Sequence, residues 1–142
     1  MRRSLDEQAA VAVVPRTAAT VLILRDASDG PEVLMVRRSP NASFMPGAYV
    51  FPGGAVDDGD AGPDTDESDD EIERRIGSVL GVNGRARAFA VAALRECFEE
   101  CGLWLGVDTP FDATGLRATL HGGTTIGDVA RLGSLPLATS GL

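Results

Sequence analysis

Four residues near the middle of the sequence, Arg95, Glu96, Glu99 and Glu100, are of the types that act on phosphate groups. They end an alanine-rich run, 85–101, which we predict to be one helix. A helical step of about 100° per residue places the three glutamates within about 100° of one another. The opposite side is a broad apolar stripe, formed by Ala90, Ala93, Leu94, Cys97, Phe98 and Cys101. The helix therefore has a core face and a carboxylate face.

The carboxylate face suggests a cation. Like charges three or four residues apart on a helix cost about 0.2–0.5 kcal/mol per pair, and no basic residue is interleaved among the three glutamates to relieve that cost. Oxygen-only ligands suit Mg²⁺ or Mn²⁺, which share their remaining positions with water and substrate phosphates. A solvated acidic face explains the same pattern, and the spacing alone does not decide between the two.

The segment Arg95-Glu96-Cys97-x-Glu99-Glu100-x-Gly102-Leu103 resembles the second half of the Nudix box, and Phe51-Pro52-Gly53-Gly54 resembles the loop that opens it. The sequence departs from the pattern between these halves. Asp60 stands where the family pattern has Glu, and 34 residues, 61–94, separate it from Arg95 where the pattern has seven. Cys97 also takes an aliphatic position, which is a mild change for a small apolar thiol.

The segment ahead of this split box resembles the coenzyme A and acyl-CoA diphosphatase branch of the Nudix family. Arg38-Ser39 and Gly47 keep the register of that branch from Leu34 through Gly54. Three positions depart from its signature: Met35, Val36 and Ser43.

The resemblance implies a fold, a cofactor and a reaction. The fold is an α/β/α sandwich around a mixed sheet. The cofactor is Mg²⁺ or Mn²⁺, and the substrate is a nucleoside diphosphate linked to another moiety, with coenzyme A or an acyl-CoA favoured. The metal ligands implied are Glu96, Glu99, Glu100 and the carbonyl of Gly53. One glutamate, Glu96 or Glu100, would be the general base, and Arg95 would orient a glutamate through an ion pair.

Three further residues are candidates near the substrate. Arg37 and Arg38 close a predicted strand and could reach phosphates, although exposed arginines at a strand end are more common. Asp60, with Asp57, is expected near the active site because both follow Gly54 closely. The other acids of the insertion 57–84 are expected to keep it solvated.

Two other function classes remain open. A Nudix-like binding protein without turnover would keep the acidic helix and bind a metal or nucleotide. An acidic metal-buffering protein is disfavoured by the register kept from Leu34 through Gly54.

Composition and charge limit the classes of partner and the location that we expect for the chain. The chain has 142 residues, 44% of them hydrophobic, which suffices for one core. A formal charge of −8 argues against a general surface for nucleic acid or anionic membrane. Cys97 and Cys101 are predicted to be reduced and buried, and the apolar run 9–14 is too short for a signal peptide, so the cytoplasm is the default location. A homodimer is an option that the sequence leaves open.

The expected organisation is a flexible lead, 1–15, followed by a Nudix-like domain, 16–142. Predicted strands cover 17–25, 32–37 and 48–51, and the near-continuous apolar run of 32–37 suggests that both its faces are covered. Predicted helices cover 72–80, 85–101, 114–121 and 125–132, the last two inside a helical segment, 112–135. Trp104 is expected in the core within an extended piece, 103–107. Few strand patterns follow 108, so the Nudix-like fold is expected to be incomplete at the C-terminus, as in a truncated or split-off member, with an unpaired sheet edge.

Overall fold

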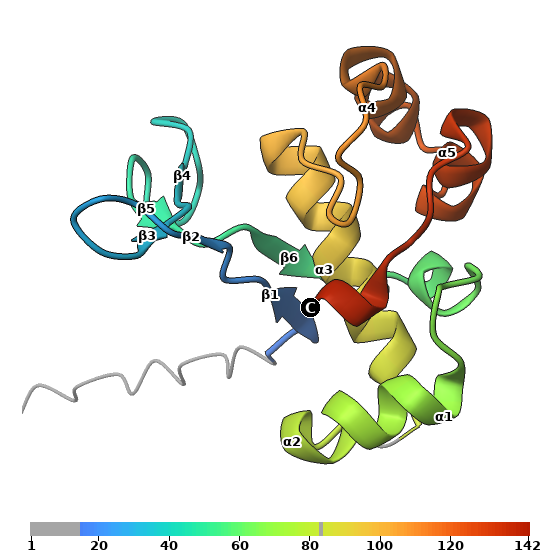
Figure 1. Ribbon diagram of the computed structural model, residues 1–142. Helices are drawn as coiled ribbons and strands as arrows, with labels where there is room; N and C mark the ends of the chain where they lie inside the picture. Colours follow the sequence, from blue (N-terminus) through green and yellow to red (C-terminus); the bar gives the residue numbers. More distant parts are fainter. Residues whose placement is uncertain (1–14, 83) are drawn as a thin grey trace, which may run out of the picture.

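The computed structural model describes residues 15–82 and 84–142 (Figure 1), so most of the predicted lead lies outside the described residues. The strands are Ala18–Thr20 (β1), Leu24–Arg25 (β2), Glu32–Val33 (β3), Val36–Arg37 (β4), Tyr49–Val50 (β5) and Gly53–Ala55 (β6). The helices are Asp69–Ile72 (α1), Ser78–Leu80 (α2), Ala86–Cys101 (α3), Ala113–His121 (α4) and Ile126–Gly133 (α5). Short helical turns cover Asp58–Ala61, Glu73–Gly77 and Thr139–Gly141.

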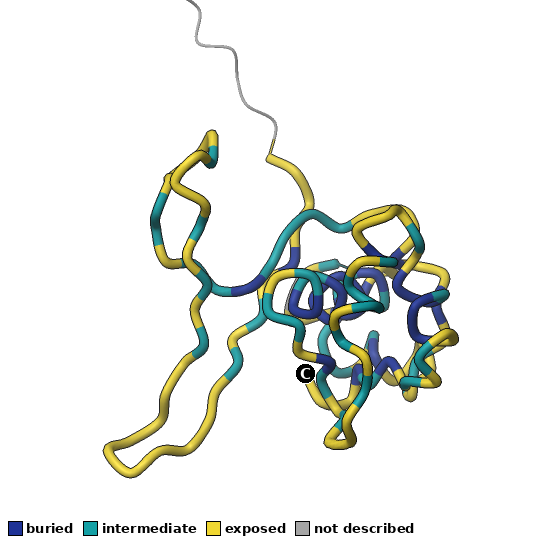
Figure 2. Tube along the Cα trace, turned by 90° about the horizontal axis from the view of Figure 1, so that it is seen from above, coloured by how far each residue is buried: buried dark blue, intermediate teal, exposed yellow. Residues whose placement is uncertain are grey.

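The strands form three antiparallel pairs, β1 with β6, β2 with β3 and β4 with β5. β1 and β6 lie against α3, whereas β2 to β5 form an arm that extends away from the helices (Figures 1 and 2). The expected mixed sheet is not formed by the described residues. The strands of the chain are only two or three residues long, and each pairs with a single antiparallel neighbour. These pairs do not join into a larger sheet among the described residues.

The prediction that 32–37 is covered on both faces is wrong. Val33 and Met35 remain 43% and 40% exposed, because this run lies in the arm, where no helix packs against it. An apolar strand becomes buried only where another element packs against its faces. Among the described residues, no element packs against this run.

The main core forms around α3 and confirms its predicted apolar stripe. Val91, Leu94 and Phe98 pack against buried residues of α4 and α5 and against Trp104. The Phe98 and Trp104 rings meet edge to face with centroids 4.9 Å apart, and the Trp104 indole N–H donates to the carbonyl of Pro136 at 2.6 Å. Trp104 is thus a core residue as predicted, but 103–107 forms no strand. Burying a side chain such as Phe98 contributes about 1.5–3 kcal/mol.

Helix ends follow the sequence signals. α3 ends at Gly102, whose φ of 71° is left-handed and whose N–H donates to the Phe98 carbonyl. This is the position where glycine is favoured, because a Cβ strains that conformation. Asp112 caps α4 and Thr125 caps α5 with their side-chain oxygens. His121 is the last residue of α4, as predicted. None of the helices among the described residues is long and apolar enough to span a membrane.

The acidic insertion is more ordered than its composition suggests. Its helical part begins at Asp69, capped by Ser68, and the fully buried Ile72 packs against Ala86 and Ala90 of α3. Other acids bind the segment near residue 139. Asp66 accepts from the Thr139 hydroxyl at 3.0 Å, and Glu67 pairs with Arg75, which donates to the Thr139 carbonyl at 2.8 Å. These two acids therefore hold tertiary contacts instead of solvating the insertion.

The two cysteines are free, as predicted. Cys97 is buried and Cys101 is half-buried. Burial, with a further contribution from Cys101, raises the pKa of the Cys97 thiol to about 12, so that thiol stays protonated at neutral pH.

Candidate active site

Arg95 of α3 is the centre of the candidate site. Its side chain is only 8% exposed, and it forms a two-pronged ion pair with Asp60, which is 2% exposed. Arg95 Nε lies 2.9 Å from Asp60 Oδ1, and Nη2 lies 3.0 Å from Oδ2. Nη2 also donates to the Ala55 carbonyl at 2.7 Å. The structure therefore brings together two residues separated by the 34 residues of 61–94.

The same guanidinium contacts three further carboxylates. Nη1 lies 2.8 Å from Glu96 Oε1 and 3.4 Å from Glu99 Oε2, and Nη2 lies 3.6 Å from Asp57 Oδ2. One positive charge thus faces four negative ones, so the cluster keeps a net negative charge. Its members come from α3 and from the turn that follows β6, which is why the contact between α3 and β6 positions the site.

The Gly53-Gly54 pair of β6 lies against the glutamates. Gly53 N–H donates to Glu100 Oε2 at 3.1 Å. A Cβ on Gly54 would lie 2.3–2.6 Å from the carboxylate atoms of Glu96, so any other residue there would displace that carboxylate. The loop expected at 53–54 is in fact a strand, because Gly53 and Gly54 pair with Thr20 and Ala19 of β1.

The ladder between β1 and β6 also orients the Gly53 backbone. Val21 N–H donates to the Pro52 carbonyl and Val56 N–H to the Thr17 carbonyl, both at 3.0 Å. Because bonding residues alternate along an antiparallel ladder, the N–H and carbonyl of Gly53 lie on the side away from β1. That is the side on which its N–H meets Glu100, so the carbonyl predicted as a metal ligand faces the same side.

Two of the carboxyl groups on the acidic face, those of Glu96 and Glu100, have raised pKa values. Burial raises the pKa of Glu96; the Arg95 ion pair opposes this rise, and the charges of Glu99 and Asp57 add to it. Partial burial raises the pKa of Glu100 as well; the Gly53 N–H lowers it, and the charge of Glu96 raises it. For Arg95, burial acts to lower the pKa, but the hydrogen bonds and charge of Asp60 and then of Glu96 raise it above its ordinary value. The guanidinium therefore stays charged, while Glu96 and Glu100 resist ionisation.

These donors fit a hard divalent ion in their chemistry. They are oxygen atoms, and a cation would lower the raised pKa values of the partly dehydrated Glu96 and Glu100 carboxyls. In residues 15–82 and 84–142, however, no three His, Cys, Asp or Glu side chains are arranged to hold a metal ion. Glu96 and Glu99 turn toward Arg95 instead.

Arg37 and Arg38 lie in the arm and brace its loop. Arg37 Nε donates to the Gly47 carbonyl at 3.3 Å, and its guanidinium lies 6.0 Å from the centre of the Tyr49 ring. Arg38 Nε donates to the Phe44 carbonyl at 3.0 Å. Arg38 is close enough to the acidic face for its charge to act on the Glu100 carboxyl. Both arginines lie at a strand end, as predicted: Arg37 is the last residue of β4 and Arg38 follows it.

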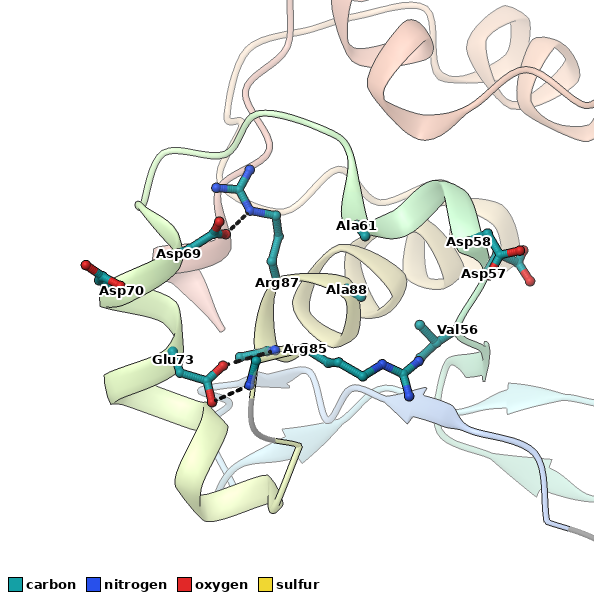
Figure 3. A pocket seen from close by; sticks show the side chains of 12 residues that line it. Val56, Asp57, Asp58, Ala61, Asp69, Asp70, Glu73, Arg85, Arg87 and Ala88 are labelled. Carbon is teal, nitrogen blue, oxygen red and sulfur yellow. Dashed lines mark hydrogen bonds and ion pairs between the residues drawn. The ribbon is translucent and has the colours of Figure 1, made fainter.

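A cleft of about 400 Å³ adjoins the site and shares Asp57 with it (Figure 3). Most of its charged groups already have partners. Glu73 accepts from the backbone N–H groups of Gly84 and Ala86, and Arg87 binds Asp69 and the carbonyl of Pro63. The cleft is therefore built largely from contacts that hold the insertion to the beginning of α3.

The sequence did not single out Arg117 of α4. Its guanidinium donates to the backbone carbonyl of Glu99. No local pattern marks this contact, because the two residues are 18 positions apart and belong to different helices.

No protein-family model and no curated protein sequence matches the chain. A solved structure does match: the crystal structure of the NUDIX hydrolase from Alicyclobacillus acidocaldarius, at 31% sequence identity and a TM-score of 0.61. The chain is similar to a Nudix hydrolase. The match covers 85% of this chain and 54% of the other, so the chain spans about half the length of that Nudix hydrolase.

This similarity supports the Nudix family for the chain. It agrees with the mixture of short strands and helices in the structure, where Arg95 and Asp60, from the two segments that resemble parts of a Nudix box, lie in contact.

Proposed function

We propose that this chain is a member of the Nudix family and a metal-dependent diphosphatase, which hydrolyses the pyrophosphate bond of a nucleoside diphosphate linked to another moiety. The observation that carries the proposal is the acidic face of α3, gathered around Arg95 and closed by the glycine pair of β6. The similarity to a Nudix hydrolase over 85% of the chain supports it independently.

Each residue has a role in this proposal. Glu96, Glu99, Glu100 and the Gly53 carbonyl would hold Mg²⁺ or Mn²⁺, which when bound neutralises charge on the diphosphate and acidifies a water molecule. Glu96 or Glu100 accepts the proton of the attacking water at a carboxylate oxygen. Arg95 orients Glu96 and Glu99, and Asp60 holds Arg95 in place.

Coenzyme A or an acyl-CoA is the substrate that we favour. The support is the register of 34–54, which ends in the glycine pair beside Glu96 and Glu100. Arg37 and Arg38 lie within that stretch and are the arginines that we propose to meet a phosphate. Cleavage would yield phosphopantetheine or its acyl form, together with adenosine 3',5'-bisphosphate.

A second candidate function is metal or nucleotide binding without turnover. The ion pairs of Arg95 with Glu96 and Glu99 favour its nucleotide-binding form, because they occupy two of the ligands proposed for the metal that turnover requires. A divalent ion would have to compete with the guanidinium for both carboxylates.

A product assay separates the two candidates. The purified chain is incubated with Mg²⁺ or Mn²⁺ and, in turn, coenzyme A, an acyl-CoA, NADH and ADP-ribose, and the phosphate-ester products are identified. We expect cleavage of the coenzyme A compounds, abolished by Glu99→Gln and Glu100→Gln and unchanged by Glu32→Gln, whose carboxylate pairs with Arg25 in the exposed arm. Metal binding with no cleavage of any compound would contradict the diphosphatase and support the binding protein.

A further inference from the structure

The last turn of α3 is held by a residue from another helix. Arg117 of α4 directs two donors at the backbone carbonyl of Glu99, with Nε at 3.2 Å and Nη2 closer. The last four carbonyls of a helix have no partner inside the helix. In α3 the Phe98 carbonyl receives the Gly102 N–H at 2.9 Å, and the next carbonyl, that of Glu99, receives Arg117.

The Arg117 side chain also lies along the turn that ends α3. A Cβ built on Gly102 would be 3.4 Å from Arg117 Cδ, so the Arg117 stem passes close to Gly102. A cation at this end is favoured by the helix dipole, and the bond from a charged donor is stronger than a neutral one. Arg117 therefore brings a positive charge and two donors to the C-terminal end of α3, and its stem lies close to Gly102.

Arg117 comes from a firmly placed helix. α4 packs on α3 and α5, its Leu120 is buried in the main core, and Asp112 caps its first turn through the Gly115 N–H at 2.9 Å. The guanidinium thus reaches the last turn of α3 from a fixed base. It binds a backbone atom, not a carboxylate of the acidic face.

We infer that Arg117 is a positioning residue for the candidate site: it holds the last turn of α3 so that the side chains of Glu99 and Glu100 face a divalent ion. The presence of a divalent ion at this face rests on the proposed function. The contact by which Arg117 holds the last turn of α3 rests on the structure alone. Without Arg117, the turn that carries both glutamates has one carbonyl fewer satisfied and frays more readily.

Three variants of the full chain test it. Arg117→Met removes both donors and keeps an apolar stem, and Arg117→Lys restores the charge with a single donor group. Arg131→Met is the matched control, because Arg131 of α5 is an exposed arginine that pairs only with Asp128 in the described structure. Two readouts are made at constant pH and salt: hydrogen exchange of the Gly102 amide by NMR, and binding of Mn²⁺ alone by electron paramagnetic resonance. Exchange at Val91, in the middle of α3, reports whether the helix as a whole is intact.

We expect Arg117→Met to speed exchange at Gly102 about tenfold and to weaken Mn²⁺ binding about tenfold, the range found for residues that support metal ligands. Exchange at Val91 should change little, Arg117→Lys should recover part of both effects, and Arg131→Met should show neither. Gly102 exchange or Mn²⁺ affinity within about twofold of wild type in Arg117→Met would overturn the inference. A wild-type protein that binds no Mn²⁺ would contradict the proposed function, and Gly102 exchange would then decide by itself whether Arg117 holds the turn.

Discussion

Arg95 shows how one side chain can organise a site from distant parts of a chain. Its guanidinium has a planar fork of donors, and the structure uses them on Asp60, Glu96, Glu99 and the Ala55 carbonyl. Lysine has the same charge but offers it at a single point, so it could not bridge β6, the turn after it and α3 at once. The buried pair with Asp60 is the part that fixes the arginine.

Gly54 is the residue whose substitution most directly tests the packing of the site. In Gly54→Ala, the new methyl group would meet the Glu96 carboxylate at 2.3–2.6 Å, so the carboxylate must move away from its place beside β6. We expect turnover of the preferred diphosphate to fall by about 100-fold, since small misplacements of a reacting group have effects of this size. The measurement is steady-state kinetics at saturating divalent ion.

Gly59→Ala is the control for that variant. Gly59 lies in the turn after β6, where an added Cβ would be 3.8 Å from a Thr125 methyl group and would displace nothing. Full activity in Gly54→Ala would show that Glu96 need not lie against β6, contrary to the role proposed for it.

At the scale of elements, α3 carries both the core and the chemistry. Its apolar stripe fixes the helix against α4 and α5, and this fixes which way the acidic face points. Because the glutamates are next to the buried face, they are partly dehydrated, which raises the pKa values of Glu96 and Glu100. The packing of the helix therefore produces the electrostatic strain of the site.

That strain predicts a pH dependence of stability. A carboxyl whose pKa is raised in the folded state stabilises the fold below its unfolded pKa, and this contribution is lost as pH rises through the folded pKa. In the absence of divalent ions, we expect the free energy of unfolding of the wild type to fall as pH rises above about 4.5, the ordinary glutamate value, relative to the double variant Glu96→Gln and Glu100→Gln. Urea unfolding of both proteins between pH 4 and 8 measures the difference.

Asp66 and Glu67 act in the opposite sense, because their pKa values are lowered, but they are present in both proteins and cancel in the comparison. A constant difference across the whole pH range would contradict the strain inferred for the two glutamates.

The sequence predicted α3, its two faces and its end at Gly102 because those features depend on local spacing and on one residue's backbone preference. Asp60 and Asp57 could be placed near the site through their position after Gly54. The contacts of Arg117 and Asp66 could not be predicted, because each joins residues far apart in sequence and depends on how helices pack. The exposure of Val33 escaped prediction for the same reason: an apolar run does not reveal whether another element covers it.

At the scale of the whole molecule, the chain divides into a packed helical body and an extended arm. Figure 2 shows the buried residues gathered in the body and the arm of β2 to β5 largely exposed. The arm's exposed residues include several with large apolar side chains. Those in and beside its strands are Leu22, Leu24, Val33, Met35, Phe44, Met45 and Tyr49. Few buried contacts hold the arm, so it should open more easily than the body.

Hydrogen exchange followed by mass spectrometry tests this division. We expect backbone amides of 24–50 to exchange at least about 100-fold faster than those of 88–98 in α3, since opening the arm breaks two-residue strand pairs and exposes little new apolar surface. Equal protection in the arm and in α3 would contradict the division and would show that the arm's apolar side chains are covered in solution.

The proposed function requires the acidic face of α3 to hold a divalent ion. The most direct test is titration of the protein with Mn²⁺, followed by electron paramagnetic resonance, for the wild type and for the double variant Glu99→Gln and Glu100→Gln. Because the variant removes two of the three proposed carboxylate ligands, we expect saturable binding in the wild type and an affinity at least about 100-fold weaker in the variant. If both proteins are folded and bind Mn²⁺ equally, the result would contradict a divalent-ion site on the acidic face of α3.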